Sequence, residues 1–181
     1  MPDIHESENR EHWFAVAVVP RKEKLTAQTL RMKGYTDFLP LYSMKRKWSD
    51  RIKRVELPLF PGYLFCRFDP KLRLPILKVP SVLSILGMGN IPELIPDNEI
   101  EALQTVCKAG VHALPCPYLF AGAKVRINEG PLAGVEGILI EEKETRLILS
   151  ISLLQRSIAV EVESDWITPT RIYRDFQADP R

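Results

Sequence analysis

The sequence predicts an α+β protein: an N-terminal antiparallel sheet flanked by helices, followed by a small β-barrel. Three observations predict it. Short apolar runs in the first half alternate with two breaker-free stretches of helical spacing, which indicates a helix-backed sheet. Residues 122–137 combine a strand, a turn at Gly130-Pro131 and the start of a second strand. Further alternating runs near the C-terminus are typical of barrel strands.

The first half begins with a strand and a helix. Residues 13–19 form a Val-rich apolar run before Pro20, as in a buried central strand, and residues 23–33 predict a helix that ends at Gly34 in the C-cap position. A basic hairpin around Ser49-Asp50, a strand, a short helix and a last strand should follow, over residues 38–57, 62–68, 72–79 and 82–86. Pro96-Asp97 then opens a helix whose Ile100, Leu103 and Cys107 share a face.

The second half begins with a proline-rich connection. Residues 110–118 contain Pro115 and Pro117 and show no periodicity, so they predict a linker. Residues 147–153 and 158–163 then alternate as barrel strands, and Gly134 and Gly137 suit a bend or a close backbone approach. We therefore expect an N-terminal domain over 11–109, a linker over 110–118 and a barrel over 119–172.

Charge is unevenly distributed. Residues 21–54 hold eleven Lys or Arg against three acids, a balance of +8, whereas residues 109–181 hold eight against ten, a balance of −2. The first segment is therefore suited to polyanions. The three cysteines form no CxxC pair, no signal-peptide core precedes the first strand, and no apolar run approaches the ~20 residues that span a bilayer. We expect a cytoplasmic protein without membrane contact.

Candidate catalytic residues are weak. His5 and His12 lie in a polar leader and His112 in the expected linker, while Cys107 falls on an apolar helix face and is expected in the core. Glycine clusters lack the spacing of phosphate loops. We expect no enzyme, no metal and no cofactor. Binding is the predicted class of function.

Several motifs in one order resemble the NusG family of transcription factors. Trp13-Phe14 in the first strand, the segment LPLFPGYLFCRFDP at 57–70 and the step at 79–82 resemble its NGN domain. The segment GAKVRINEGPLAGVEG at 122–137 resembles its KOW motif. The basic hairpin segment 44–65 is similar to RfaH and to UpxY-type antiterminators of polysaccharide operons. The resemblance spans about Trp13 to Thr168.

The resemblance implies an operon-specific elongation and antitermination factor, expected as a monomer, that docks on the clamp helices of bacterial RNA polymerase and suppresses pausing. Docking needs an exposed apolar patch, for which Tyr63 and Phe65 on one strand face, with Phe60, are the candidates; the alternative is that both strand rings belong to the core of the sheet. The candidates for contact with the non-template DNA strand are basic residues and one tryptophan that could stack on a base: Arg21, Lys22, Lys24, Lys45, Arg46, Lys47, Trp48, Arg51 and Lys53.

The barrel resembles the partner-binding module of the family. Leu153 and Leu154 are adjacent, so a regular strand would expose one of them beside Arg156. This site is expected to bind ribosomal protein S10, and Rho weakly or not at all, because Leu154-Gln155 stands where the housekeeping protein has an exposed Phe-Gly pair. The RfaH-like His-Thr-Thr element is replaced by Leu74-Pro75-Ile76. Two alternatives stay open: a ribosome-associated KOW protein that binds RNA, and an enzyme with an unrecognised site.

Overall fold

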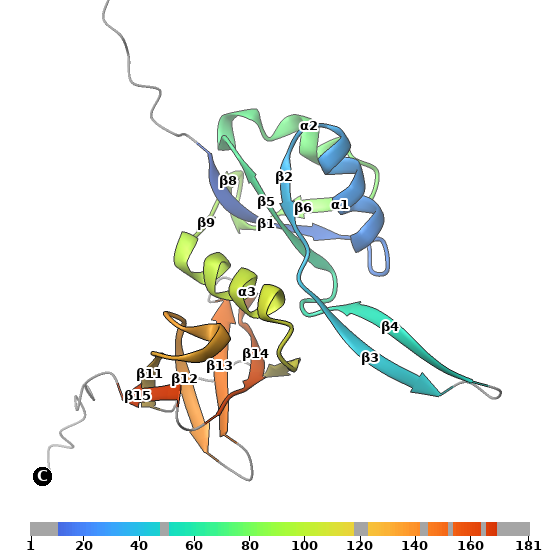
Figure 1. The fold of residues 1–181 in the computed structure, drawn as a ribbon. Helices are drawn as coiled ribbons and strands as arrows, with labels where there is room; N and C mark the ends of the chain where they lie inside the picture. Colours follow the sequence, from blue (N-terminus) through green and yellow to red (C-terminus); the bar gives the residue numbers. More distant parts are fainter. Residues whose placement is uncertain are drawn as a thin grey trace, which may run out of the picture. The chain divides into compact units, whose positions relative to one another are not determined.

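The computed structural model describes residues 11–47, 51–117, 123–141, 145–151, 154–163 and 166–169. The chain divides into two compact units, residues 1–101 with 151–154 and residues 102–150 with 155–181 (Figure 1). Each unit is built on its own antiparallel sheet. The mixed α and β composition with antiparallel pairing confirms the predicted α+β class, and the closed KOW barrel stays a prediction.

The first sheet is centred on β1 (His12–Val18). The strand order is β2-β5-β1-β6, with β9 also paired to β1, where β2 spans Thr36–Phe38, β5 Tyr63–Phe68, β6 Val82–Ile85 and β9 Leu94–Ile95. Every ladder of this sheet is antiparallel. The apolar run in the sequence is thus the central strand that it predicted.

One face of this sheet packs on helices. Phe14 on β1 and Phe68 on β5 bring their ring centroids to 4.5 Å, and Leu64 and Cys66 lie in the same buried cluster. The helices α1 (Glu23–Met32) and α2 (Leu74–Leu77) contribute to this cluster, the latter following a short 3-10 turn η1 (Pro70–Leu72). Burial raises the pKa of Cys66 to about 12, so this thiol is a core residue and not a nucleophile.

Two hydrogen bonds fix the start of α1. The buried Glu23 carboxylate accepts from the Gly62 N–H at 2.9 Å, and Thr26 Oγ1 lies 2.7 Å from Ser81 Oγ. They tie the helix to the turn before β5 and to the step before β6. At the other end Gly34 adopts φ 87°, as the predicted C-cap glycine requires.

Two hairpins leave the first sheet. The predicted basic hairpin consists of β3 (Leu41–Lys47) and β4 (Ile52–Pro58), closed at its base by the Leu59 N–H donating to the Pro40 carbonyl at 2.9 Å. The sequence prediction began its first arm at residue 38, which is wrong because Phe38 pairs with Phe65 in the sheet. The second hairpin, β7 (Gly87–Met88) with β8 (Ile91–Pro92), was not predicted.

Helix α3 (Asp97–Ala109) begins at the predicted acidic turn. Its Ile100 and Leu103 side chains are buried, whereas Cys107 is only half-buried. Acidic side chains in the first turn favour the positive end of the helix dipole.

The second sheet has the order β10-β14-β13-β12-β11-β15. Its strands, with a 3-10 turn η2 (Gly130–Leu132) between β11 and β12, are β10 (Ala113–Pro117), β11 (Ala123–Ile127), β12 (Glu136–Glu141), β13 (Thr145–Ile151), β14 (Arg156–Glu161) and β15 (Ile167–Pro169). A Cβ on Gly137 would stand 2.6 Å from the Ile148 carbonyl oxygen, so the expected close backbone approach exists there.

The linker prediction is wrong for residues 113–117. They form strand β10, which pairs along its length with β14. This segment carries no clear strand pattern, because an edge strand needs hydrogen bonds on one side only and tolerates proline. The paired residues of β14 lie 39 to 47 positions away in the sequence, so local pattern could not reveal the pairing.

Candidate nucleic-acid interface

The basic hairpin concentrates cations at its tip. In the register of β3 and β4, Lys45 lies directly opposite Arg54, and Arg46 lies opposite Lys53. Like charges directly opposite destabilise an antiparallel pair, so this arrangement works against the stability of the hairpin itself. A bound polyanion would relieve the repulsion. Arg54 was not among the predicted candidates, although it belongs to the same basic run.

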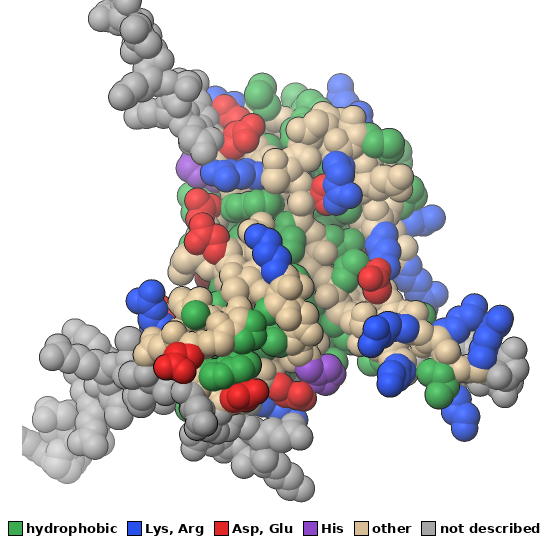
Figure 2. Space-filling view, viewed as in Figure 1, with side chains coloured by type: hydrophobic (Ala, Val, Ile, Leu, Met, Phe, Trp, Pro, Cys, Tyr) green, Lys and Arg blue, Asp and Glu red, His purple; other side chains and the backbone are tan. Residues whose placement is uncertain are grey.

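Exposed cationic side chains gather near the tip of this hairpin. Lys45, Lys47, Lys53 and Arg54 are exposed, as is Arg51 just before β4. Figure 2 shows Lys and Arg side chains gathered over the hairpin. Trp48 lies outside the described residues, as does the Arg46 side chain. Phosphate contacts from such a surface would set affinity and salt dependence rather than sequence preference.

The basic group at the start of α1 combines exposed cations with one cation that forms an ion pair. Arg21 and Lys22 are exposed in the turn after β1, and Arg21 adopts φ 68°, in the left-handed region. Lys24 Nζ lies 3.0 Å from Glu56 Oε2, so this cation is already paired across to β4. An exposed pair of this type contributes about 0–1 kcal/mol. The hairpin, with six Lys or Arg between positions 45 and 54, is the denser group of cations.

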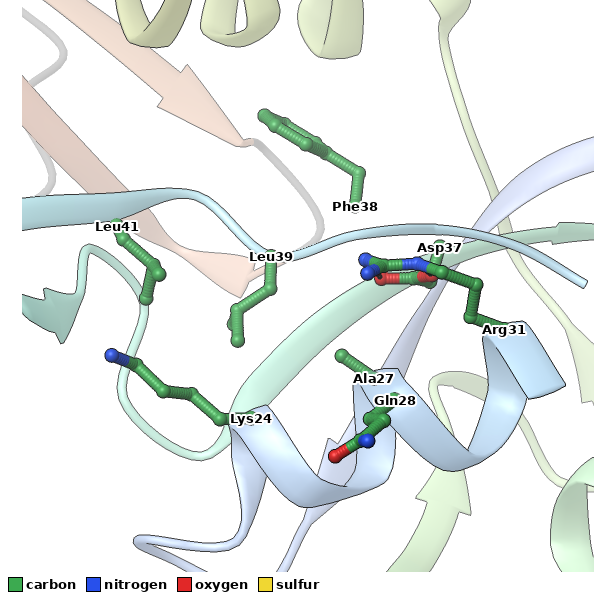
Figure 3. Close-up of a pocket in the computed structure, with 8 residues that line it drawn as sticks. All are labelled: Lys24, Ala27, Gln28, Arg31, Asp37, Phe38, Leu39 and Leu41. Carbon is green, nitrogen blue, oxygen red and sulfur yellow. Dashed lines mark hydrogen bonds and ion pairs between the residues drawn. The ribbon is translucent and has the colours of Figure 1, made fainter.

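A cleft of about 320 Å³ lies between α1 and the segment from β2 to β3 (Figure 3). Arg31 donates two hydrogen bonds to Asp37, at 2.9 and 2.8 Å, and the Asp37 side chain is only 2% exposed. This carboxylate raises the pKa of the Arg31 guanidinium. The other lining residues are Lys24, Ala27, Gln28, Phe38, Leu39 and Leu41. Arg31 and Asp37 neutralise one another's charge, and their ion pair connects α1 to β2 across the cleft.

The expectation of an exposed aromatic patch is wrong for two of its three residues. Phe65 and Phe60 are 0% and 1% exposed, whereas Tyr63 is half-buried. The Phe65 ring lies 5.7 Å from Phe60 and 6.1 Å from Phe38, centroid to centroid, so the three rings pack together. The helix-covered core takes the alternate residues of β5, so the aromatic group stands on the opposite face.

The structure describes the predicted partner site before β14 only in part. Leu154 is buried, at 9% exposure, so it is not the surface leucine of the pair. Gln155, next to it in the turn before β14, adopts φ 49°, in the left-handed region. Leu153 lies outside the described residues, and Arg156 is exposed.

The exposed apolar side chains of the β7–β8 hairpin and of the η1–α2 segment were not predicted from the sequence. Met88 and Ile91 face each other across the β7–β8 hairpin and are 84% and 75% exposed. Leu72 and Leu74 around η1 and α2 are also exposed. Strands of two residues carry no periodic signal, so only their apolar composition could have drawn attention to the hairpin.

Catalytic groups are not brought together in the described part of the chain. Among these residues no set of three His, Cys, Asp or Glu side chains lies close enough to hold a metal ion. His112 Nδ1 lies 2.9 Å from Glu161 Oε1, which makes it the partner of a carboxylate rather than of Cys107. The described helices include none with the length and hydropathy needed to cross a bilayer.

The comparisons with known proteins agree with this architecture. The family model described as transcription termination factor NusG matches residues 11–104, just over half of the 181-residue chain. The transcription termination/antitermination protein NusG of Vibrio parahaemolyticus is 28% identical over 170 residues, covering 85% of this chain and 93% of that protein. Its namesake from Buchnera aphidicola is 26% identical over 176 residues, covering 88% and 96%.

A solved structure supports the fold. The structure described as domain interaction in Thermotoga maritima NusG superposes with a TM-score of 0.54 at 17% identity, covering 89% of this chain and 98% of that one. This chain belongs to the NusG family, and its role is that of a transcription factor. The resemblance predicted from the sequence motifs is thereby confirmed at the level of the family.

Proposed function

We propose that this protein is a transcription elongation and antitermination factor that binds bacterial RNA polymerase and contacts the exposed non-template DNA strand. Membership of the NusG family supports the first part. The basic β3–β4 hairpin carries the second, because its directly opposed cations gain most when a polyanion binds. The factor acts by binding and catalyses no covalent step, and it works in the cytoplasm.

Within the first unit we assign the clamp-helix contact to Tyr63. It is the one member of the predicted aromatic patch with an accessible surface, while Phe65 and Phe60 lie buried beside Phe38. In this proposal, Phe65 and Phe60 are core residues that support the strand on which Tyr63 lies. A phenol with an apolar body and a polar tip is a common anchor residue at protein interfaces.

The DNA contact is assigned to the hairpin and the turn after β1. Lys45, Lys47, Arg51 and Lys53 are exposed, and Arg54 joins them. Arg21 and Lys22 extend the basic surface, whereas Lys24 is engaged with Glu56 and contributes less. Arg46 and Trp48 remain candidates on the basis of the sequence.

We further propose an operon-specific role, in which the second unit is the KOW module. The antiparallel order of its five strands β11 to β15 and the turn at Gly130 support a barrel of that type. Ribosomal protein S10 is the proposed partner through Leu153 and Arg156. The burial of Leu154 and the absence of an aromatic residue there argue against a strong Rho interface.

The proposal is tested with a reconstituted elongation complex of bacterial RNA polymerase. Adding the full-length protein should shorten pauses, and Tyr63→Ala should weaken complex binding at least tenfold while leaving the unfolding midpoint unchanged within error. Tyr63→Phe, which keeps the ring, is the matched control. Association with ribosomes but not with polymerase would replace this proposal by the ribosomal alternative. Normal binding by Tyr63→Ala would remove the clamp-helix assignment alone.

A further inference from the structure

One acid stands among the cations of the basic hairpin. The described strands β3 and β4 contain five Lys or Arg residues and a single acid, Glu56. Glu56 Oε2 lies 3.0 Å from Nζ of Lys24, so this ion pair connects the hairpin to α1. We propose that Glu56 occupies, in the free protein, the place on Lys24 that a backbone phosphate takes when nucleic acid binds. The proposal rests on the proposed contact between the hairpin and nucleic acid.

The register places Glu56 beside a pair of cations. Side chains two residues apart on a strand share a face, so Glu56 and Arg54 lie on one face of β4. Lys45 is directly opposite Arg54, and Ser43 is directly opposite Glu56. Two residues of an antiparallel strand rise about 6.8 Å, so the carboxylate lies one row of side chains away from Lys45 and Arg54. A phosphate bound to these two cations would therefore have the Glu56 anion as its neighbour.

The region between the helix and the hairpin is open to solvent. Lys24 and Gln28 on α1 face Leu39 and Leu41 across the cleft of about 320 Å³. Figure 3 shows the Lys24 side chain extending from α1 toward the start of β3. The side chains of Lys24 and Glu56 are 54% and 59% exposed. A phosphate group can therefore reach the Lys24 ammonium without any movement of the core.

The ion pair is weak enough to be exchanged. An exposed Lys–Glu pair contributes little to stability, because water screens both charges and two flexible side chains must be held in one geometry. A phosphate on a nucleic acid strand is the stronger partner, because its neutralisation also releases a condensed counterion. Glu56 is exposed, so it returns to water without being buried as an unpaired charge. Exchange of the carboxylate for a phosphate is therefore favourable for Lys24.

The number of released counterions reveals whether the exchange takes place. If a phosphate replaces Glu56, Lys24 neutralises that phosphate and adds about 0.7 to the slope of log K against log salt on a single strand. If the ion pair persists in the complex, Lys24 adds to the slope only after Glu56 has been removed. Substitutions of Lys24 and of Glu56 thus have opposite signatures in the two cases.

The test measures salt dependence with the full-length protein. The probe is a fluorescently labelled single-stranded oligothymidylate of about 15 nucleotides, titrated between about 50 and 200 mM salt. Lys24→Gln should reduce the slope by about 0.7. Glu56→Gln should leave the slope unchanged and raise the affinity at least threefold, because Lys24 no longer has to exchange partners. The double variant should show the reduced slope of Lys24→Gln.

Two matched controls correct for net charge. Lys33→Gln removes a cation at the opposite end of α1, and Glu93→Gln removes an exposed acid of the same unit. Each should change the affinity less than twofold. The unfolding midpoints of all variants should agree within error, because all four substituted side chains are exposed.

Three outcomes would contradict this account. A slope that Lys24→Gln leaves unchanged and Glu56→Gln steepens by about 0.7 would show that the ion pair persists, and would overturn the proposal alone. An equal gain in affinity from Glu93→Gln and Glu56→Gln would also overturn it, since net charge would then account for the effect. A flat salt dependence of the unchanged protein would remove the nucleic-acid contact itself, and this proposal with it.

Discussion

The central sheet of the first unit and its basic hairpin differ in side-chain exposure: the sheet buries apolar side chains, whereas the hairpin exposes cations. In β1 and β5, most side chains are buried and the phenylalanine rings pack together. In β3 and β4, the tip is exposed and places Lys45 opposite Arg54 and Arg46 opposite Lys53. The sheet gains stability from burial. The hairpin gives up some stability to hold cations together, as expected of the proposed polyanion-binding surface.

The largest loss of unfolding free energy should come from a substitution at Phe65. Because this ring is fully buried against Phe38 and Phe60, Phe65→Ala should lower the free energy of unfolding by about 3–5 kcal/mol. Urea denaturation of the full chain measures it. Ile52→Ala in the hairpin, where the side chain is 68% exposed, is the control and should stay within about 0.5 kcal/mol. A mild effect at Phe65 would return this residue to the exposed patch that the sequence predicted.

A smaller loss is expected where a polar side chain supports the sheet. Glu23→Ala leaves the Gly62 N–H without its buried acceptor and should cost about 1–3 kcal/mol. Glu56→Ala removes a carboxylate whose partner Lys24 is exposed, and should cost about 0–1 kcal/mol. Equal losses from the two substitutions would mean that the bond to Gly62 does not anchor α1.

The smallest effect concerns the hairpin alone. Lys45→Glu places an acid opposite Arg54, and opposite-charge pairs contribute about 0.2–1 kcal/mol. Amide protection in β3 and β4 should therefore rise. Lys47→Glu, opposite the uncharged Ile52, is the matched control and should produce little gain. If protection rises in both variants alike, general charge density and not the cross-strand pair is responsible.

The sequence pattern correctly predicted the elements whose structure depends on residues close together in the chain. The Val-rich run of β1, the glycine that ends α1 and the alternation of β13 each depend on a few neighbouring residues. Strand β10 was missed because its pairing partner is distant in sequence, and β7 to β9 because two residues carry no period.

For the candidate site, the sequence predicted which residue types are present but not how they pair or how exposed they are. The basic composition of the hairpin is visible in the sequence, but the direct opposition of Lys45 and Arg54 depends on register. The burial of Phe65 depends on rings contributed from positions 38 and 60, which no spacing rule brings together. Exposure is a tertiary property, so Tyr63 and Phe65 could share a strand face and still differ in accessibility.

The most direct test of the account is the salt dependence of binding to an elongation complex whose non-template strand is exposed. Replacing Lys45, Arg46 and Lys47 together by Ala should reduce the slope of log K against log salt by about 2, because about 0.7 counterions are released per neutralised phosphate of a single strand. The unfolding free energy should not fall by more than about 0.5 kcal/mol, since the hairpin tip is exposed. An unchanged slope with intact folding would contradict the assignment of the hairpin to nucleic acid.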